Sequence, residues 1–191
     1  IVDASVNLNK INDFIQRNNL ILEKIFITHT HQDHIQFLDN ILNQFPQTQI
    51  CAYEKSEVKL ESHHRKLINH EIISLGSEII TTMHTPGHYP DSLCFWNKRN
   101  NSLFTGDTMF VGRTGRTIGP KSNISHLYRS IYKQILQLPE QTIIYPGHHY
   151  GYTSQITLKE NITLSPFFQC LSEDEFIEVM AEYEKNRRAP K

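Results

Sequence analysis

Three histidines and one aspartate fall within six residues of this chain, in the segment His29-Thr30-His31-Gln32-Asp33-His34. The segment directly follows the apolar, strand-like run 24–28. A turn at the end of a strand holds its side chains rigidly and directs them outward, and nitrogen and oxygen donors held in this way bind borderline cations such as zinc. The sequence therefore predicts a metal site, and the chain must fold so that other donors can reach this turn.

Three further turns carry candidate ligands, which argues against a chance cluster among the 11 histidines of the chain. These turns are Thr85-Pro86-Gly87-His88, Phe104-Thr105-Gly106-Asp107 and Tyr145-Pro146-Gly147-His148. The last two follow apolar, strand-like runs. His29 and His31 point to the same side of an extended turn, so they can share one ion. His88 would complete a three-nitrogen set that leaves a coordination position open for water, as catalytic zinc requires.

The order of these motifs, HxHxDH, TPGH, TGD and PGH, resembles that of the metallo-β-lactamase superfamily and covers almost the whole chain. Within that superfamily, the stretch from Leu127 to Met180 resembles two glutathione-linked branches. These branches are the glyoxalase II-like thioester hydrolases, or hydroxyacylglutathione hydrolases, and the persulfide dioxygenases. The resemblance implies an α/β fold, the four-layer αββα sandwich, of which this chain would lack the first strands.

The resemblance also implies a second ion. Asp33, His34 and His148 would hold it, and Asp107 would bridge the two ions. Two adjacent cations lower the pKa of a shared water toward neutrality, and Asp33 and Asp107 can orient the resulting hydroxide, so both count as catalytic. His149 is an alternative to His148, but the Pro-Gly turn places His148 as the family motif does.

Substrate recognition is predicted at two further residues. Arg116, in the Gly-rich loop 112–117, aligns with the basic residue that contacts the peptide part of glutathione in both branches, and a guanidinium can grip a carboxylate through two hydrogen bonds. Tyr150 aligns with a substrate-contacting tyrosine of the glyoxalase II-like enzymes. The alternatives are an exposed loop with solvated arginines and a tyrosine that only packs.

Strand and helix patterns alternate along the chain without repeats or a linker, which predicts a single domain over residues 1–191 with a short C-terminal helical segment at about 172–188. Apolar spacing of three and four residues predicts helices over 8–15 and 35–45, the second ended by Pro46. Further strands are expected at 49–52, 72–75, 78–84, 93–96, 102–105 and 142–145, and further helices at 54–60, 123–137, 155–163 and 173–187.

Composition excludes several classes of partner. The 191 residues include 19 basic and 20 acidic side chains, so the net charge of −1 offers no field for nucleic acid or an anionic membrane. Three cysteines without CxxC spacing predict buried, reduced thiols. No apolar run reaches the length that spans a bilayer, so we expect a cytoplasmic protein, although an organellar leader could be missing from this chain. The chain could form a homo-oligomer, and the sequence does not decide this point.

The leading interpretation is hydrolysis of a glutathione thioester by a hydroxide held on two divalent metal ions, most simply zinc, which also stabilise the oxyanion. The alternative is a glutathione persulfide dioxygenase with one Fe(II), held by His29 or His31, His88 and Asp107. A third reading is a degenerate scaffold that keeps only the fold. The intact set of candidate ligands argues against that reading.

Overall fold

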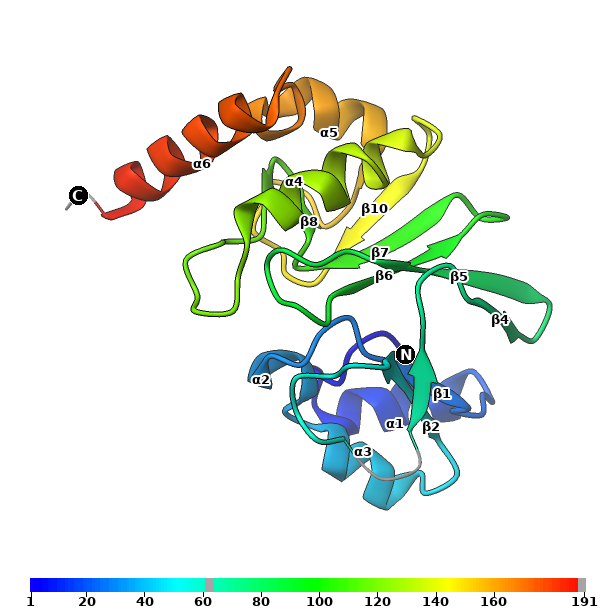
Figure 1. Cartoon of the computed structure of the whole chain (residues 1–191). Helices are drawn as coiled ribbons and strands as arrows, with labels where there is room; N and C mark the ends of the chain where they lie inside the picture. Colours follow the sequence, from blue (N-terminus) through cyan, green and yellow to red (C-terminus); the bar gives the residue numbers. More distant parts are fainter. Residues whose placement is uncertain (61–63, 189–191) are drawn as a thin grey trace.

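The computed structural model describes residues 1–60 and 64–188, and it shows two β-sheets packed face to face with helices on the outer face of each (Figure 1). The expected αββα sandwich is therefore confirmed. No helix in the described part of the chain is both long and apolar enough to cross a bilayer.

The smaller sheet is parallel, with strand order β1-β2-β3. Its strands are β1 (Lys24–Phe26), β2 (Gln49–Tyr53) and β3 (Arg65–Leu67). Three helices belong to this half of the molecule: α1 (Leu8–Arg17), α2 (Gln32–Ile35) and α3 (Leu38–Gln44). Ile11 of α1 and Ile41 of α3 pack with Ile25 and Ile50 of the sheet in one buried cluster. The apolar face of these helices thus covers the outer face of the smaller sheet.

The larger sheet has the strand order β11-β10-β7-β6-β5-β4. Its strands are β4 (Ile72–Leu75), β5 (Glu78–His84), β6 (Leu93–Asn97), β7 (Ser102–Gly106), β10 (Ile143–Pro146) and β11 (Ile156–Thr157). Phe26 and Leu67 of the smaller sheet pack against Ile80 and Phe95 of the larger one, in a cluster between the two sheets. The backbone N–H of Leu93 also donates to the carbonyl of Thr28 at 2.7 Å, which joins the sheets at the edge where β1 ends.

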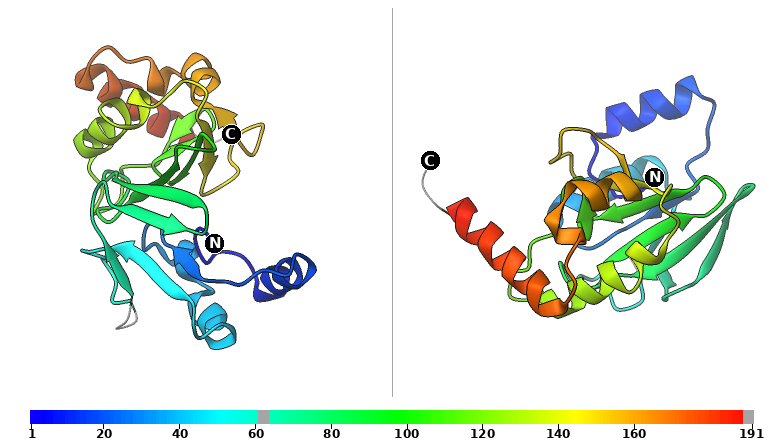
Figure 2. Two further views of the ribbon diagram at one scale, coloured as in Figure 1. Left: turned by 90° about the vertical axis from the view of Figure 1, so that its right-hand side faces the viewer. Right: turned by 90° about the horizontal axis from the view of Figure 1, so that it is seen from above.

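The second helical layer is formed by α4 (Ile124–Tyr132), α5 (Leu158–Leu164) and α6 (Glu173–Arg188). Short 3-10 turns lie at Ile135–Gln137 and Pro166–Phe168. Leu127, Leu158 and Phe176 are fully buried in one cluster with Ile144 of β10. The last turns of α6 extend beyond the sandwich (Figure 2). A two-stranded ribbon of β8 (Met109–Phe110) and β9 (Arg113–Thr114) follows the Asp107 turn.

Most predicted elements agree with the structure, but the helix predicted at 54–60 is wrong. These residues form turns and bends. The hydroxyl of Ser56 donates to the carbonyl of Tyr53 at 2.8 Å, and the N–H of Glu57 donates to Asp91 at 3.0 Å. In both bonds a side chain pairs with a backbone group. Such pairs compete with the backbone hydrogen bonds of a helix.

Three other predicted helices have different bounds. The segment 35–45 divides into α2 and α3, and α3 ends before Phe45 because a residue that precedes proline disfavours the helical conformation. The segment 123–137 divides into α4 and a 3-10 turn. Helix α5 begins at Leu158, after β11, because Thr157 and Glu160 form a capping box. Strands β3, β8, β9 and β11 are not predicted from the sequence, since each has only two or three residues.

Candidate metal centre

Strand pairing determines where the candidate ligands meet. Strands β7 and β10 are parallel, with Pro146 paired to Gly106, and the N–H of Gly147 donates to the carbonyl of Gly106 at 2.9 Å. The residues that follow these strands, Asp107 and His148, therefore lie side by side. His29 follows β1 at the edge where Thr28 and Leu93 join the two sheets. The four turns thus open at one rim of the sandwich.

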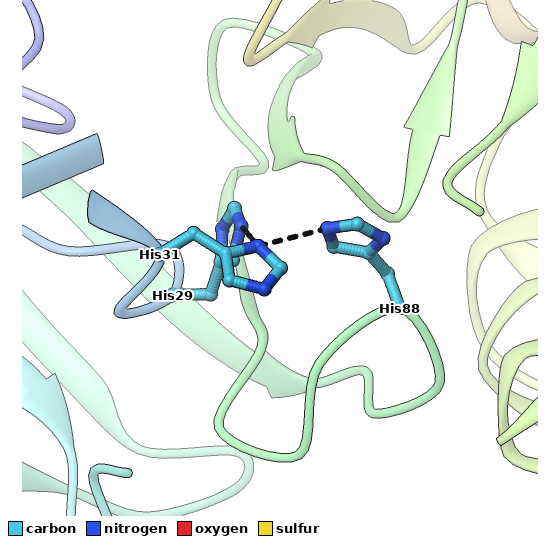
Figure 3. Close-up of side chains that lie close together, drawn as sticks. All are labelled: His29, His31 and His88. Carbon is cyan, nitrogen blue, oxygen red and sulfur yellow. Dashed lines mark hydrogen bonds between the residues drawn. The ribbon is translucent and has the colours of Figure 1, made fainter. Parts of the chain in front are cut away.

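The first group of donors consists of His29, His31 and His88, whose rings converge from two separate segments (Figure 3). Nε2 of His29 lies 2.9 Å from Nδ1 of His31, which lies 3.1 Å from Nε2 of His88. Two donors bound to a tetrahedral zinc ion at about 2.0–2.1 Å are roughly 3.3 Å apart. The spacing of these nitrogens is thus close to that of ligands around one cation.

The second group consists of Asp33, His34 and His148. Oδ2 of Asp33 lies 3.1 Å from Nε2 of His148 and 3.9 Å from Nε2 of His34. Asp107 lies between the two groups: its carboxylate oxygens are 3.3 Å from His34, 3.6 Å from His88 and 3.7 Å from His148. The structure therefore brings all seven predicted ligands together, with Asp107 between the two groups.

Two buried atoms in this cluster test whether a metal ion fits. Nε2 of His34 and Oδ1 of Asp107 are shielded from solvent and face each other at 3.3 Å, yet neither makes a hydrogen bond within the described part of the chain. Buried polar atoms normally have a partner, so such atoms need an explanation. Nitrogen and carboxylate donors together suit a divalent transition metal. The donor set fits a divalent cation, which would give both atoms a partner.

The protonation states of the imidazoles differ across the cluster. Burial, reinforced by the neighbouring His34 and His88, holds the pKa of His29 well below its usual range, so His29 is a neutral donor. Burial opposes the charge on His34 as well, but Asp107 and Asp3 outweigh it and raise the pKa of His34 to about 10. A proton on Nε2 of His34 faces Asp107, so a metal ion that binds this nitrogen would have to displace the proton.

Two buried carboxylates hold the histidine-rich turn in place. Asp3 accepts from Nδ1 of His34 at 2.7 Å, and from the N–H and the hydroxyl of Thr28 at 2.7 and 2.8 Å. Asp91 accepts hydrogen bonds from the N–H and hydroxyl of Thr30. A ligand histidine whose other ring nitrogen is fixed by a carboxylate is oriented toward the metal. Sequence reasoning missed both aspartates because neither belongs to a motif of candidate ligands.

His88 is oriented by the loop that contains Arg116. Its Nδ1 lies 2.9 Å from the backbone carbonyl of Arg116, so Nδ1 carries the proton and Nε2 is left to face His31. His149, the alternative to His148, has an exposed side chain. The choice of His148 for the cluster thus agrees with the geometry.

A cavity of about 320 Å³ opens over the donor groups. Its walls include His31, Asp33, His88, Asp107, Phe110, Arg113, Thr114, Arg116, His148, Tyr150 and Tyr183. This volume lies at the lower end of the range for small-molecule sites, about 300–1,000 Å³. A second cavity of about 400 Å³ adjoins it, because His31, His88 and Arg116 line both. Both predicted substrate residues, Arg116 and Tyr150, therefore border the donor cluster.

The surroundings of these two residues include contacts that the sequence did not reveal. The ring of Tyr150 stacks on His148 with centroids 5.0 Å apart, and the guanidinium carbon of Arg113 lies over the Tyr150 ring, 5.0 Å from its centroid. Arg113 donates to the hydroxyl of Tyr183 at 2.9 Å, and Arg116 pairs with Glu184. Tyr183 and Glu184 belong to α6, and no local pattern marks them.

The sequence and the structure of this chain resemble those of known proteins. Residues 1–148 match the sequence profile of the metallo-beta-lactamase superfamily. The hydroxyacylglutathione hydrolase of Francisella tularensis subsp. novicida is 35% identical over 138 residues, which make up 72% of this chain and 54% of that protein. The hydroxyacylglutathione hydrolase of Bartonella henselae is 31% identical over 172 residues, 88% of this chain and 65% of that protein.

The chain thus spans between half and two thirds of the length of these curated relatives. Among solved structures, the crystal structure of ETHE1 from Myxococcus xanthus superimposes with a TM-score of 0.84 at 26% sequence identity. That superposition covers 100% of this chain and 80% of the other.

Proposed function

The chain belongs to the metallo-beta-lactamase superfamily, and from this we propose that it is a metal-dependent hydrolase that cleaves a glutathione thioester. The observation that carries the proposal is the meeting of seven nitrogen and carboxylate donors, from four separate turns, in two groups joined by Asp107. The substrate class is suggested by the two relatives named hydroxyacylglutathione hydrolase. An S-(2-hydroxyacyl)glutathione is the simplest substrate of this class.

Each donor group would hold one divalent cation, for which zinc is the simplest choice. When bound, two such cations lower the pKa of a water ligand to near neutrality and polarise a carbonyl oxygen. Asp33 is 56% exposed and lines the cavity, so its carboxylate can orient the attacking water and receive its proton. Asp107, which lies between the two donor groups, would neutralise part of the positive charge of the cations and hold the two groups close together.

The remaining residues of the cavity would bind the substrate. Arg116 offers a planar fork of N–H donors that matches a carboxylate of the glutathione peptide. Tyr150, 52% exposed beside His148, offers a hydroxyl at the same mouth. This chemistry needs no thiol nucleophile, in keeping with the burial of all three cysteines. Burial raises the pKa of Cys94 to about 11, which keeps that thiol protonated.

A second candidate function uses a single Fe(II) in the same place. Nε2 of His88 lies 3.6 Å from Oδ2 of Asp107 and 3.1 Å from Nδ1 of His31, so two imidazoles and one carboxylate can reach one ion. Two histidines with one carboxylate are the ligand set of non-haem iron oxygenases. The reaction would be oxidation of glutathione persulfide to sulfite by dioxygen.

Metal analysis combined with two assays separates these functions. Protein purified without added metal is analysed for zinc and iron, and is then tested for cleavage of S-lactoylglutathione and for oxygen uptake with glutathione persulfide. Two zinc ions per chain with thioester turnover are expected. One iron per chain with oxygen uptake and no thioester cleavage would establish the second function instead. Because His88 and Asp107 serve both mechanisms, their alanine variants should be inactive in either assay and serve as controls.

A further inference from the structure

Helix α6 reaches the mouth of the metal-centre cavity through two consecutive side chains. The hydroxyl of Tyr183 accepts a hydrogen bond from Arg113 at 2.9 Å. The carboxylate of Glu184 accepts two hydrogen bonds from Arg116, from Nε at 3.0 Å and from Nη2 at 3.2 Å. Arg113, Arg116 and Tyr183 all line the cavity. The C-terminal helix is thus attached to the loop that we expect to bind substrate.

The pair of hydrogen bonds between Glu184 and Arg116 has the geometry of carboxylate recognition. A guanidinium binds a carboxylate through two parallel N–H donors, and this arrangement is both directional and selective for the planar anion. Glu184 uses Nε and Nη2 of Arg116 for it. The carboxylate of a bound peptide would need the same kind of paired donors. Glu184 therefore occupies a position on Arg116 that a substrate carboxylate would take.

The ion pair lies where a ligand can replace it. The side chain of Arg116 is 43% exposed and that of Glu184 is 13% exposed. Water reaches the Arg116 side of the pair, and screening of this exposed charge limits the net stability that the pair contributes. Arg116 itself is held in place by its backbone, whose carbonyl bonds to His88 at 2.9 Å. The guanidinium can thus exchange one carboxylate for another without disturbing the loop that orients His88.

We propose that Glu184 is a specificity residue that competes with a carboxylate of the substrate for Arg116. The proposal rests on the function proposed above and extends it by giving Glu184 a role at the Arg116 subsite, as a competitor of the substrate carboxylate. Binding of such a ligand transfers Arg116 from Glu184 to the ligand, while the hydrogen bond between Arg113 and Tyr183 still attaches α6 to the loop. A ligand without the carboxylate leaves the ion pair intact, and its affinity does not depend on Glu184.

Ligand binding to the metal-loaded protein tests the proposal without relying on turnover. The probe is S-hexylglutathione, a thioether that cannot be hydrolysed, and its dissociation constant is measured by titration calorimetry. Glu184→Gln should decrease the Kd about two- to fivefold, the range expected from releasing a partly exposed ion pair. The diethyl ester of the probe, which lacks both carboxylates, should bind the variant and the unsubstituted protein equally.

Two control variants separate competition from other effects. Glu182→Gln removes the same charge from an exposed position of the same helix and should leave the Kd unchanged. In an Arg116→Ala background, Glu184→Gln should no longer tighten binding, because the contested guanidinium is gone. Circular dichroism verifies that each variant is folded.

An unchanged Kd for Glu184→Gln would overturn the proposal. A raised Kd would also overturn it and would show that Glu184 holds Arg116 ready for substrate. Failure of the unsubstituted protein and of Glu184→Gln to bind the probe, together with failure to cleave a thioester, would count against the glutathione substrate itself. The experiments therefore distinguish a failure of the proposed function from a failure of the proposed role of Glu184.

Discussion

Asp3 connects the backbone of the smaller sheet to the candidate metal centre. It is buried, and its carboxylate accepts from both the backbone and the hydroxyl of Thr28 as well as from Nδ1 of His34. It sits in the left-handed region with φ of 58°, which an aspartate tolerates better than most residues. One carboxylate thus fixes the end of β1 and the direction in which Nε2 of His34 points. Its role is to position a ligand.

Asp3→Asn should weaken metal binding at the second donor group. The amide cannot provide the charged acceptor that orients His34, and loss of such a partner typically lowers metal affinity about 10- to 100-fold. Competition with a chromophoric chelator measures the affinity for zinc, and circular dichroism measures folding. Asp39→Asn, at an exposed position of α3, is the control and should bind zinc like the unsubstituted protein. Equal zinc affinity of Asp3→Asn and the control would show that Asp3 serves the strand end alone.

At the scale of elements, the parallel pair β7 and β10 allows two ligand-bearing turns to approach closely. A Cβ on Gly147 would lie 2.6 Å from Oδ1 of Asp107 and 2.8 Å from Cε1 of His34, both shorter than real contacts. The φ of Gly147 does not lie in the left-handed region, so its backbone conformation does not require glycine. Glycine is required because a Cβ would not fit between these two side chains. The PGH motif thus has a steric role besides carrying His148.

Gly147→Ala should therefore reduce activity strongly. The added methyl group must push Asp107 or His34 aside, and a displacement of about 1 Å in a catalytic group can cost roughly 100-fold in rate. Thioester turnover and zinc content are measured on the same preparation. Gly119→Ala is the matched control, because no described heavy atom lies within 4 Å of its added Cβ. Full turnover by Gly147→Ala would mean that the two turns are not packed as closely as the structure places them.

The elements that sequence predicts well are those specified by local pattern. The segment 78–84, rich in β-branched residues, and the runs at 93–96 and 102–105 predict β5, β6 and β7 with bounds correct to one residue. The meeting of the ligands could also be predicted, because their motifs follow strands whose ends lie at one edge of the sandwich. Two contacts that sequence reasoning missed are the bond of Glu57 to Asp91, in the segment where the helix at 54–60 was wrongly predicted, and the contact of Glu184 with Arg116. In each, the partner lies more than 30 positions away along the chain, where local spacing does not reveal it.

At the scale of the whole molecule, the candidate metal centre joins the two halves of the sandwich. His29, His31, Asp33 and His34 follow β1 of the smaller sheet. His88, Asp107 and His148 lie in loops of the larger sheet. Each donor group contains residues from both halves, since His88 completes the first and His148 the second. Bound cations would therefore link the halves at the rim, in addition to the apolar cluster between the sheets.

Removing metal should consequently lower the thermal stability of the whole domain. A ligand that binds only the folded state at about 1,000 times its Kd contributes roughly 4 kcal/mol to the free energy of unfolding. For a domain of this size, each kcal/mol shifts Tm by about 2–4 °C, so chelation should lower Tm by roughly 8–16 °C. Scanning calorimetry with and without chelator measures the shift, and added zinc should restore it. His88→Ala, which removes a cross-sheet ligand, should show a smaller response to chelator. An unchanged Tm after verified metal removal would show that the apolar contacts alone hold the two sheets together.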